Sequence, residues 1–133
     1  MVLETDMTVY EFVGGAETFR RLVNEFYARV EADAALRRLF PEDLEPGKEY
    51  QFLFLTQYFG GPAIYSERRG HPRLRMRHMP FAIDQQARDA WLSHMLAAID
   101  AIAIAEPARS VMCEYFERAS EAMINTYQPH EDG

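Results

Sequence analysis

The sequence predicts a single all-α domain, and three observations support this prediction. Apolar residues recur at steps of three and four, the spacing of one face of an α-helix. No segment shows the sustained apolar-polar alternation of a half-buried strand. The chain has 133 residues, of which 48% are apolar and 26% charged, an ordinary balance for one hydrophobic core. We therefore treat residues 1–133 as one helical domain.

Two short and two long helices are predicted in the first half of the chain. They cover residues 8–13, 16–32, 34–39 and 46–59. The first is ended by Gly14-Gly15, the third by Pro41 and the fourth by Gly60-Gly61. The apolar stripe of the second helix consists of Phe19, Leu22, Val23, Phe26, Tyr27 and Val30.

The segment from Gly60 to Phe81 differs from the helices on either side. It reads GGPAIYSERRGHPRLRMRHMPF and holds five arginines and two of the four histidines, with few aliphatic residues. It is too long for a compact helical connection, so we expect a ligand to order it. The nine Phe and seven Tyr residues of the chain favour a flat apolar guest. By themselves, however, aromatic stripes are more typical of a plain core than of a cofactor pocket.

Two further long helices are predicted after this segment. Asp84 is a suitable N-cap for the first, and Pro107 suits the first turn of the second. The inner face of the first is expected to consist of Ala87, Ala90, Trp91, His94, Met95, Ala98, Ile99 and Ile102. The second is expected to bury Val111, Met112, Tyr115, Phe116, Ala119, Ala122 and Met123. The polar tail, residues 128–133, is expected to fray.

Charge and composition limit the partners of the chain. The net charge of −7 argues against general binding to nucleic acid or anionic lipid, because both require a clustered positive surface. No apolar run approaches the roughly 20 residues that span a bilayer, and no signal peptide is evident. Cys113 is the only cysteine, so no intrachain disulfide can form. The default expectation is a cytoplasmic protein with no nucleic-acid or membrane partner.

Common local motifs of enzymes are absent. The chain contains no G-x-x-x-x-G-K-[ST], H-E-x-x-H, C-x-x-C or G-x-S-x-G. Pro72 lies between His71 and His78, which argues against the continuous helix that would bring both to one metal ion. A single histidine can still bind iron when a porphyrin supplies four nitrogen ligands and the protein one axial ligand.

Five features, in order along the chain, resemble the second group of truncated haemoglobins. They are the two glycine pairs, Phe26-Tyr27, FLTQYFGGP at residues 54–62, YSERRGHPRLRMRHMPF at residues 65–81 and RDAWL at residues 88–92. The resemblance extends from Thr8 to Tyr127. It implies a truncated globin fold, in which a two-over-two helical sandwich encloses haem b.

The resemblance implies that His78 is the proximal ligand of the haem iron. Its second ring nitrogen is expected to donate a hydrogen bond to a carbonyl or similar acceptor, which orients the ring. Arg77, Arg75 and Tyr65 fall where this family meets the haem propionates, and an arginine fork matches a carboxylate. For Arg77 we favour contact with a propionate, whereas for Arg75 a solvated basic face is an equal alternative.

On the other side of the haem, the resemblance places Tyr27, Gln51 and Trp91 around the bound gas. All three side chains can donate a hydrogen bond, and donors in a dry pocket stabilise bound dioxygen more strongly than in water. High oxygen affinity with slow release is the implied result. Apolar walls of the haem pocket are implied for Phe54, Leu55 and Met95, each of which also fits an ordinary core.

Two further positions bear on the distal side. Phe40 stands where some members of the group have tyrosine, so this chain lacks that hydroxyl and any tyrosine-to-tyrosine linkage it permits. Phe40 is therefore expected only to pack on the haem. Gly47 falls where full-length globins usually have the distal histidine, and the resulting gap at the haem edge would admit ligands.

The sequence therefore predicts a haem protein that binds dioxygen reversibly, and other diatomic gases such as CO and NO. Nitric oxide dioxygenation and peroxidase chemistry are both open, and each needs a separate reductase because the chain has no flavin or nicotinamide module. Two alternatives are a haem-free helical adaptor, whose arginines from Arg68 to Arg77 dock an acidic or phosphorylated partner, and a gas sensor that signals through a partner. A homodimer is left open.

Overall fold

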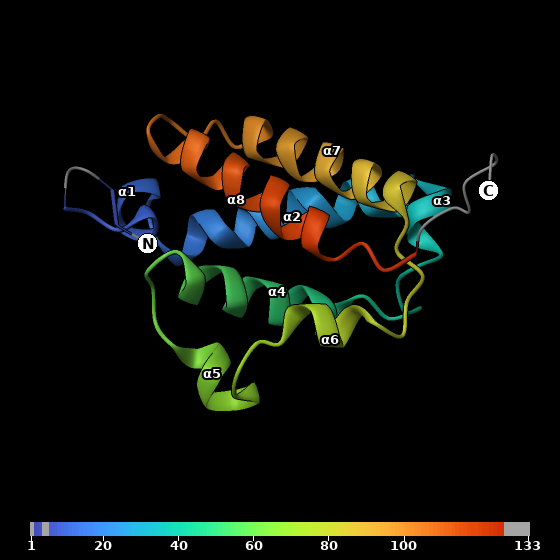
Figure 1. Cartoon of the computed structure of the whole chain (residues 1–133). Coiled ribbons are helices and arrows are strands. Elements are labelled where there is room, and N and C mark those ends of the chain that lie inside the picture. Colours follow the sequence, from blue (N-terminus) through green and yellow to red (C-terminus); the bar gives the residue numbers. More distant parts are fainter. Residues whose placement is uncertain (1, 4–5, 127–133) are drawn as a thin grey trace.

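The fold is built from helices (Figure 1). The computed structural model describes residues 2–3 and 6–126, in which the β contact is one isolated antiparallel bridge between Val2 and Thr8. The helices are α1 (Val9–Val13), α2 (Ala16–Ala32), α3 (Ala34–Arg37), α4 (Glu45–Tyr58), α5 (Ile64–Arg69), α6 (Leu74–His78), α7 (Gln85–Ala101) and α8 (Ala108–Ala122). The all-α prediction is confirmed, whereas the tail predicted to fray lies outside the described residues.

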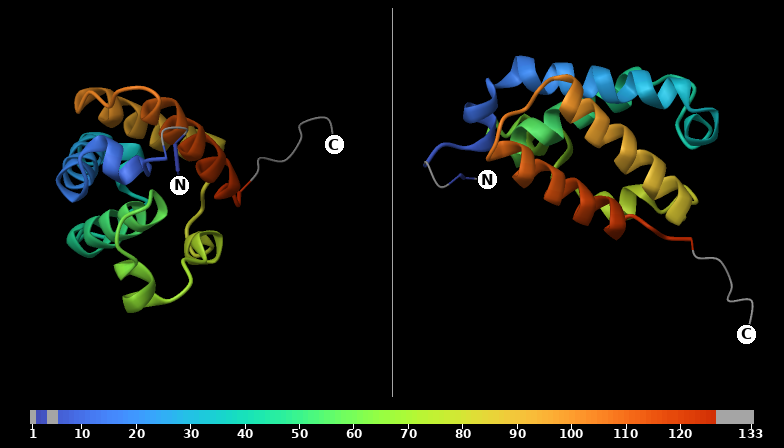
Figure 2. Two further views of the ribbon diagram at one scale, coloured as in Figure 1. Left: turned by 90° about the vertical axis from the view of Figure 1, so that its left-hand side faces the viewer. Right: turned by 90° about the horizontal axis from the view of Figure 1, so that it is seen from above.

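Four long helices form the body of the domain. α2 packs against both α4 and α7, and α7 packs against α8. Seen from above, α2 crosses α7 at an angle, while α7 and α8 run side by side (Figure 2). The predicted sandwich of two helices over two is confirmed. None of the helices in the described ranges is both long and apolar enough to span a bilayer.

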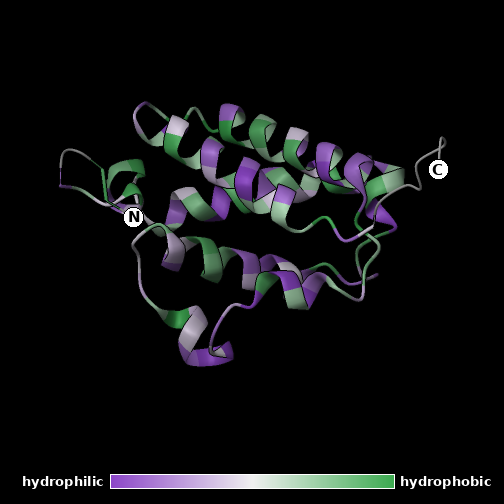
Figure 3. Ribbon diagram, in the orientation of Figure 1, coloured by the Kyte–Doolittle hydropathy of each residue, from purple (hydrophilic) through white to green (hydrophobic). Residues whose placement is uncertain are grey.

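The core lies between these helix pairs and is rich in aromatic rings. The six residues of the stripe predicted for α2 are all buried. Phe59 links the pairs, because its ring lies 5.7 Å from that of Phe19 on α2 and 6.2 Å from that of Phe116 on α8. Burial of each such side chain stabilises the fold by about 1.5–3 kcal/mol. Figure 3 shows apolar and polar residues alternating around the long helices, as this burial requires.

Local signals account for the helix ends. Asp84 caps α7 as predicted, because its Oδ1 accepts a hydrogen bond from the Ala87 backbone N–H at 2.8 Å. Gly60 ends the turn after α4 with a φ of +107°, and a Cβ there would lie 2.5 Å from Cβ of Thr8. Only glycine permits both the left-handed backbone and this close approach to the N-cap of α1.

Two predictions for the second half of the chain need correction. The segment over residues 60–81 is not one long connection, because α5 and α6 form within it. Tyr65 is buried in α5, which gives this short helix an inward face. The prediction that Ala122 is buried is wrong, since the side chain is exposed. α8 ends at Ala122, and Ser120 and Ile124 are buried there instead.

Candidate functional site

A cavity of about 580 Å³ lies inside the domain and is lined by residues from every helix from α2 to α8. Its walls are largely apolar. Nine of the eleven predicted site residues line it, namely Tyr27, Phe40, Gln51, Phe54, Leu55, Tyr65, Arg77, His78 and Trp91. The tertiary structure therefore brings predicted residues from five helices and one loop to a single site, which is the usual setting of a small-molecule ligand.

His78 ends α6 and has one ring nitrogen committed to the backbone. Its Nδ1 lies 2.6 Å from the carbonyl oxygen of Leu74. A carbonyl only accepts, so Nδ1 carries a proton, and in the neutral imidazole Nε2 keeps a free lone pair. This is the hydrogen bond expected from the sequence, and it leaves Nε2 available as a metal ligand.

α6 is held in place by polar contacts, since none of its five residues is buried. The contacts come from residues 122–125, which we call the C-terminal clasp. Arg75 donates to the carbonyls of Ala122 and Ile124 at 2.8 and 3.1 Å. Asn125 donates from Nδ2 to the carbonyls of His78 and Phe81, at 3.1 and 2.8 Å. The carbonyl end of the candidate ligand residue is thereby tied to the chain beyond α8.

Arginine side chains lie at the edge of the cavity. Arg77 donates from Nε to the Pro72 carbonyl at 2.8 Å and from Nη2 to the Arg69 carbonyl at 3.4 Å. The guanidinium of Arg69 lies 4.0 Å from the ring centroid of Tyr50, and both Arg69 and Tyr50 line the cavity. A mainly apolar interior whose wall includes the guanidinium groups of Arg69 and Arg77 fits a flat apolar ligand that carries carboxylates.

Three polar side chains meet the cavity from three different long helices. Tyr27 comes from α2, Gln51 from α4 and Trp91 from α7. Oε1 of Gln51 is buried without a hydrogen-bond partner among the described residues. A buried unsatisfied polar atom costs about 1–3 kcal/mol, so it usually has a functional explanation. A small polar ligand in the cavity would supply the missing partner.

Tyr27 is fixed by packing and keeps its proton. Its ring contacts those of Phe26 and Phe40 edge-on, at centroid distances of 5.3 and 5.9 Å. Burial raises the pKa of Tyr27 to about 12, because the phenolate is disfavoured away from water. The hydroxyl is therefore a hydrogen-bond donor at any physiological pH.

Gly47 leaves the space that the Tyr27 hydroxyl occupies. A Cβ at this position would lie 3.1 Å from Oη of Tyr27, closer than ordinary van der Waals contact. Gly47 is exposed and also lines the cavity. Ligand entry at this edge stays a prediction. The structure shows a different role for Gly47, which is to leave room for the Tyr27 hydroxyl.

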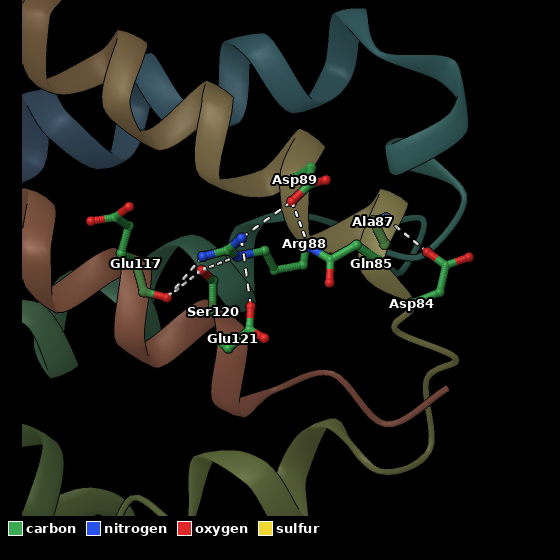
Figure 4. A network of polar contacts seen from close by, with 8 residues as sticks. All are labelled: Asp84, Gln85, Ala87, Arg88, Asp89, Glu117, Ser120 and Glu121. Carbon is green, nitrogen blue, oxygen red and sulfur yellow. Dashed lines mark hydrogen bonds and ion pairs between the residues drawn. The ribbon is translucent and has the colours of Figure 1, made fainter. Parts of the chain in front are cut away.

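Two aromatic rings pack against Trp91, and a polar network fixes the turn of α7 that precedes it. The rings are those of Phe26 and Phe116, at 5.1 and 5.9 Å. In the network, Arg88 donates from Nε to Oγ of Ser120 at 3.1 Å and from Nη2 to the Glu117 carbonyl at 3.2 Å (Figure 4). Nη1 of Arg88 also pairs with Asp89 and Glu121. The network joins α7 to α8 and fixes the turn that precedes Trp91.

Two predicted residues are not brought to the cavity. Met95 is fully buried in the core between the helices, so its prediction as a pocket wall is not supported. Arg75 points to the C-terminal clasp, where its guanidinium is committed to backbone carbonyls. The sequence left two alternatives for Arg75, contact with a propionate and a solvated basic face. The structure shows a third arrangement, in which Arg75 binds backbone carbonyls.

Sequence reasoning also missed part of the cavity wall. The missed lining residues are Leu36, Leu39, Pro41, Tyr50, Arg69, Leu74, Phe81, Ile83, Ala87, Arg88, Tyr115, Phe116, Ala119, Ser120 and Met123. The apolar stripes did identify some of these, such as Phe116 and Ala119, as inward-facing. Periodicity does not distinguish a residue that faces a cavity from one that packs in a core. The role of Asn125 had no local signal at all.

Known proteins share this fold and much of this sequence. A family model described as bacterial-like globin matches residues 8–125. The group 2 truncated haemoglobin YjbI of Bacillus subtilis is 41% identical over 116 residues, which cover 87% of each chain. A haemoglobin structure from the thermophilic phototrophic bacterium Chloroflexus aurantiacus is 68% identical with a TM-score of 0.87, covering 89% of this chain and 98% of that one. The structure of the truncated oxygen-avid haemoglobin of B. subtilis is 41% identical with a TM-score of 0.85, and the match covers 89% of this chain and 99% of that one.

Proposed function

Because this chain belongs to the bacterial-like globin family, and within it to the group II truncated haemoglobins, we propose that its cavity holds haem b and binds dioxygen reversibly. His78 is the proposed proximal ligand, and Tyr27, Gln51 and Trp91 are the proposed donors toward the gas. The similar haemoglobin of B. subtilis is described as oxygen-avid, which agrees with this assignment.

One observation carries the proposal from this chain itself. A single cavity contains a histidine with its Nε2 lone pair free and three polar side chains, one of which has a buried oxygen without a partner among the described residues. A plain apolar core would have no reason to contain such groups, because each costs free energy unless a ligand satisfies it. The haem-free adaptor offers no explanation for this arrangement.

His78 would hold the iron of a bound haem, and the iron would supply the chemistry that binds a diatomic gas such as O2, CO or NO. The protein supplies the surroundings. The carbonyl of Leu74 holds the Nδ1 proton of His78 and so fixes which nitrogen is available. Tyr27 keeps its hydroxyl proton and would donate a hydrogen bond to a ligand that carries partial negative charge. Because packing already positions this donor, little reorganisation is needed when the gas binds.

We expect slow release of dioxygen to follow from these donors. Each hydrogen bond to the gas contributes on the order of 1 kcal/mol, or about five-fold in the dissociation rate. Mainly apolar walls, including Phe54, Leu55 and Phe40, keep water from competing for the same donors. Phe40 adds no hydroxyl of its own.

For the haem propionates we propose Arg77 and Tyr65, as the sequence predicts, and we add Arg69. Arg69 and Arg77 line the cavity, whereas Arg75 does not. A guanidinium pairs with a carboxylate in a bidentate manner, which suits the edge of a haem. Nitric oxide dioxygenation, peroxidase activity, a separate reductase, a homodimer and a cytoplasmic location stay predictions from the sequence.

The proposal is tested by adding haemin to the purified chain and recording absorption spectra. We expect a Soret band on addition, a shift on reduction with dithionite, and further shifts under oxygen and under carbon monoxide. Absence of a Soret band, or a ferrous spectrum indifferent to both gases, would contradict haem-based gas binding and favour the adaptor.

A further inference from the structure

A second hollow, of about 450 Å³, opens on the surface at the end of α5 and along α6. We call it the basic hollow. Its lining residues are Arg69, Gly70, His71, Arg73, Met76 and Arg77. Figure 1 shows that α5 and its loop to α6 protrude below the long helices, and the first view of Figure 2 agrees. The basic hollow is therefore accessible to a macromolecule.

The basic hollow carries positive charge that the described residues do not neutralise. From Arg68 to Ile83 the sequence has five arginines and no aspartate or glutamate. The ion pairs found in the described residues all involve other basic side chains, on α2, α4, α7 and α8. Among the described residues, the hydrogen bonds of Arg77 go to backbone carbonyls. With haem bound, Arg69 and Arg77 would pair with its propionates, whereas the exposed Arg68 and Arg73 would keep their charge for a partner. A concentrated positive surface on a chain of net charge −7 attracts acidic surfaces locally.

Neighbouring groups suit a protein partner. The backbone N–H of Arg73 donates to Nδ1 of His71 at 3.1 Å, so a neutral His71 carries its proton on Nε2 and can donate. Met76 lies in the basic hollow and is 58% exposed, and nearby Met79 is 57% exposed. Arginine and methionine are both enriched at protein interfaces, where flexible apolar side chains supply contact area beside the charges.

The basic hollow adjoins the proposed haem cavity. Arg69 and Arg77 line both, so the two spaces share a wall of side chains. His78 directly follows Arg77 in α6. A protein docked in the basic hollow would therefore approach the proximal side of the haem. The chain contains no flavin or nicotinamide motif that would supply electrons from within.

From this arrangement we propose that the basic hollow docks an acidic one-electron carrier protein. The carrier gives up one electron, and ferric haem gains it to become ferrous. This inference rests on the proposed haem function, because only a bound haem has an iron to reduce. A carrier with a compact acidic patch fits better than nucleic acid or a membrane, because a long polyanion or an extended anionic surface would also meet the acidic remainder of the chain. Redox partners typically use small transient interfaces of this kind.

The test uses an acidic plant-type [2Fe–2S] ferredoxin as the probe. One variant, Arg73→Glu, reverses a charge in the basic hollow, and the control Arg21→Glu reverses an exposed charge on α2. Two quantities are measured at low and high salt: the affinity of oxidised ferredoxin for the ferric protein, and the second-order rate of haem reduction by reduced ferredoxin. We expect Arg73→Glu to lower both by about ten-fold or more at low salt, with a smaller difference at high salt. Arg21→Glu should stay close to the wild type.

Equal losses in the two variants would overturn the proposal, since net charge alone would then explain the effect. An unchanged rate of haem reduction in Arg73→Glu would also overturn it. A third contrary result is competition in which duplex DNA or anionic vesicles displace bound ferredoxin at a lower concentration than added free ferredoxin does. Dithionite reduction and the oxygenated spectrum should be the same in all three proteins. If haemin gives no Soret band, the proposed function fails, and the ferredoxin titration of the haem-free chain still reports whether the basic hollow binds an acidic protein.

Discussion

The two sides of the cavity are built in different ways. The side that we propose as distal, formed by α2, α4 and α7, presents Tyr27, Gln51 and Trp91 from helices of 14 to 17 residues. The proximal arm, which we define as residues 64–78, presents His78 from a helix of five residues with none buried. Ring packing fixes Tyr27 and Trp91, two of the proposed distal donors. Polar contacts from the C-terminal clasp fix His78, the proposed proximal ligand.

This difference indicates where a ligand matters for folding. The distal helices bury apolar stripes whether or not the cavity is filled, so their side chains are positioned in advance. The arm has little apolar burial of its own and depends on hydrogen bonds to backbone carbonyls. Segments with few buried apolar contacts open at low free-energy cost. We therefore expect haem to stabilise the arm far more than the distal side.

The largest expected effect comes from removing the proposed proximal ligand with His78→Gly. Loss of a supporting hydrogen bond at a metal site typically costs roughly 10–100-fold in affinity, and loss of the ligand itself should exceed that. Haemin dissociation, followed by transfer to a competing apoglobin, measures the effect. Added imidazole should restore a five-coordinate ferrous spectrum. The control is His71→Gly in the same arm, and a normal spectrum in His78→Gly without imidazole would exclude His78 as the ligand.

The next effect tests the clasp through Asn125→Ala. This change removes the donors to the His78 and Phe81 carbonyls and the acceptor of the Ile83 N–H. We expect a cost of about 1–2 kcal/mol, or about 5–30-fold faster haemin loss. Hydrogen exchange should rise in the arm and not in α2. Asn24→Ala, an exposed site on α2, serves as the control, and a uniform rise in exchange across both regions would contradict a local role for the clasp.

A distal change should alter gas release and leave haem retention unaffected. In Gly47→Ala the new methyl group must displace the Tyr27 hydroxyl, since the Cβ would lie 3.1 Å from it. We expect oxygen dissociation to change by about five-fold, similar to the loss of one hydrogen bond in Tyr27→Phe. Stopped-flow measurements on both single variants and the double variant complete a cycle. If Gly47→Ala has its full effect in a Tyr27→Phe background, the glycine does not act through the tyrosine.

The smallest effect concerns acid stability at the corner between α2 and α3. The hydrogen bond from the His94 side chain, with that from the Leu36 N–H, lowers the pKa of Asp33 below its usual 3.8. The native carboxyl is therefore ionised where the unfolded one is protonated. Its contribution to stability is present above the unfolded pKa and is lost as pH falls through the lowered folded value.

Urea unfolding of Asp33→Asn checks this assignment. The difference in stability between the variant and the wild type should be largest near pH 7 and should shrink as pH falls below about 4. Glu31→Gln, an exposed change at the end of α2, is the control. A difference that stays constant with pH would show that the His94 contact does not depend on the charge of Asp33.

Much of the fold could be predicted because its signals are local. The bounds predicted for α2, residues 16–32, rest on its apolar stripe and on the Gly14-Gly15 pair before it, and they are confirmed to the residue. Asp84 as the cap of α7 is confirmed as well. The two short helices of residues 60–81 were not predicted, because neither is long enough to establish a period. The N-cap of α6, Arg73, also has a positive φ of 46°, which is unusual for a residue other than glycine. α5 is held by the neighbouring α4, whereas α6 is held by residues more than 40 positions further along the chain.

The site also has a part that the sequence predicted and a part that it did not. Residue identity and motif resemblance were sufficient to nominate His78, Tyr27, Gln51 and Trp91, because the chemistry of a haem pocket needs those side-chain types. Local patterns could not show that Met95 packs in the core, that Arg75 serves the clasp, or that Gly47 makes room for a hydroxyl. The clasp joins residues more than 40 positions apart in the sequence, and only packing in three dimensions decides which side chains meet over such separations.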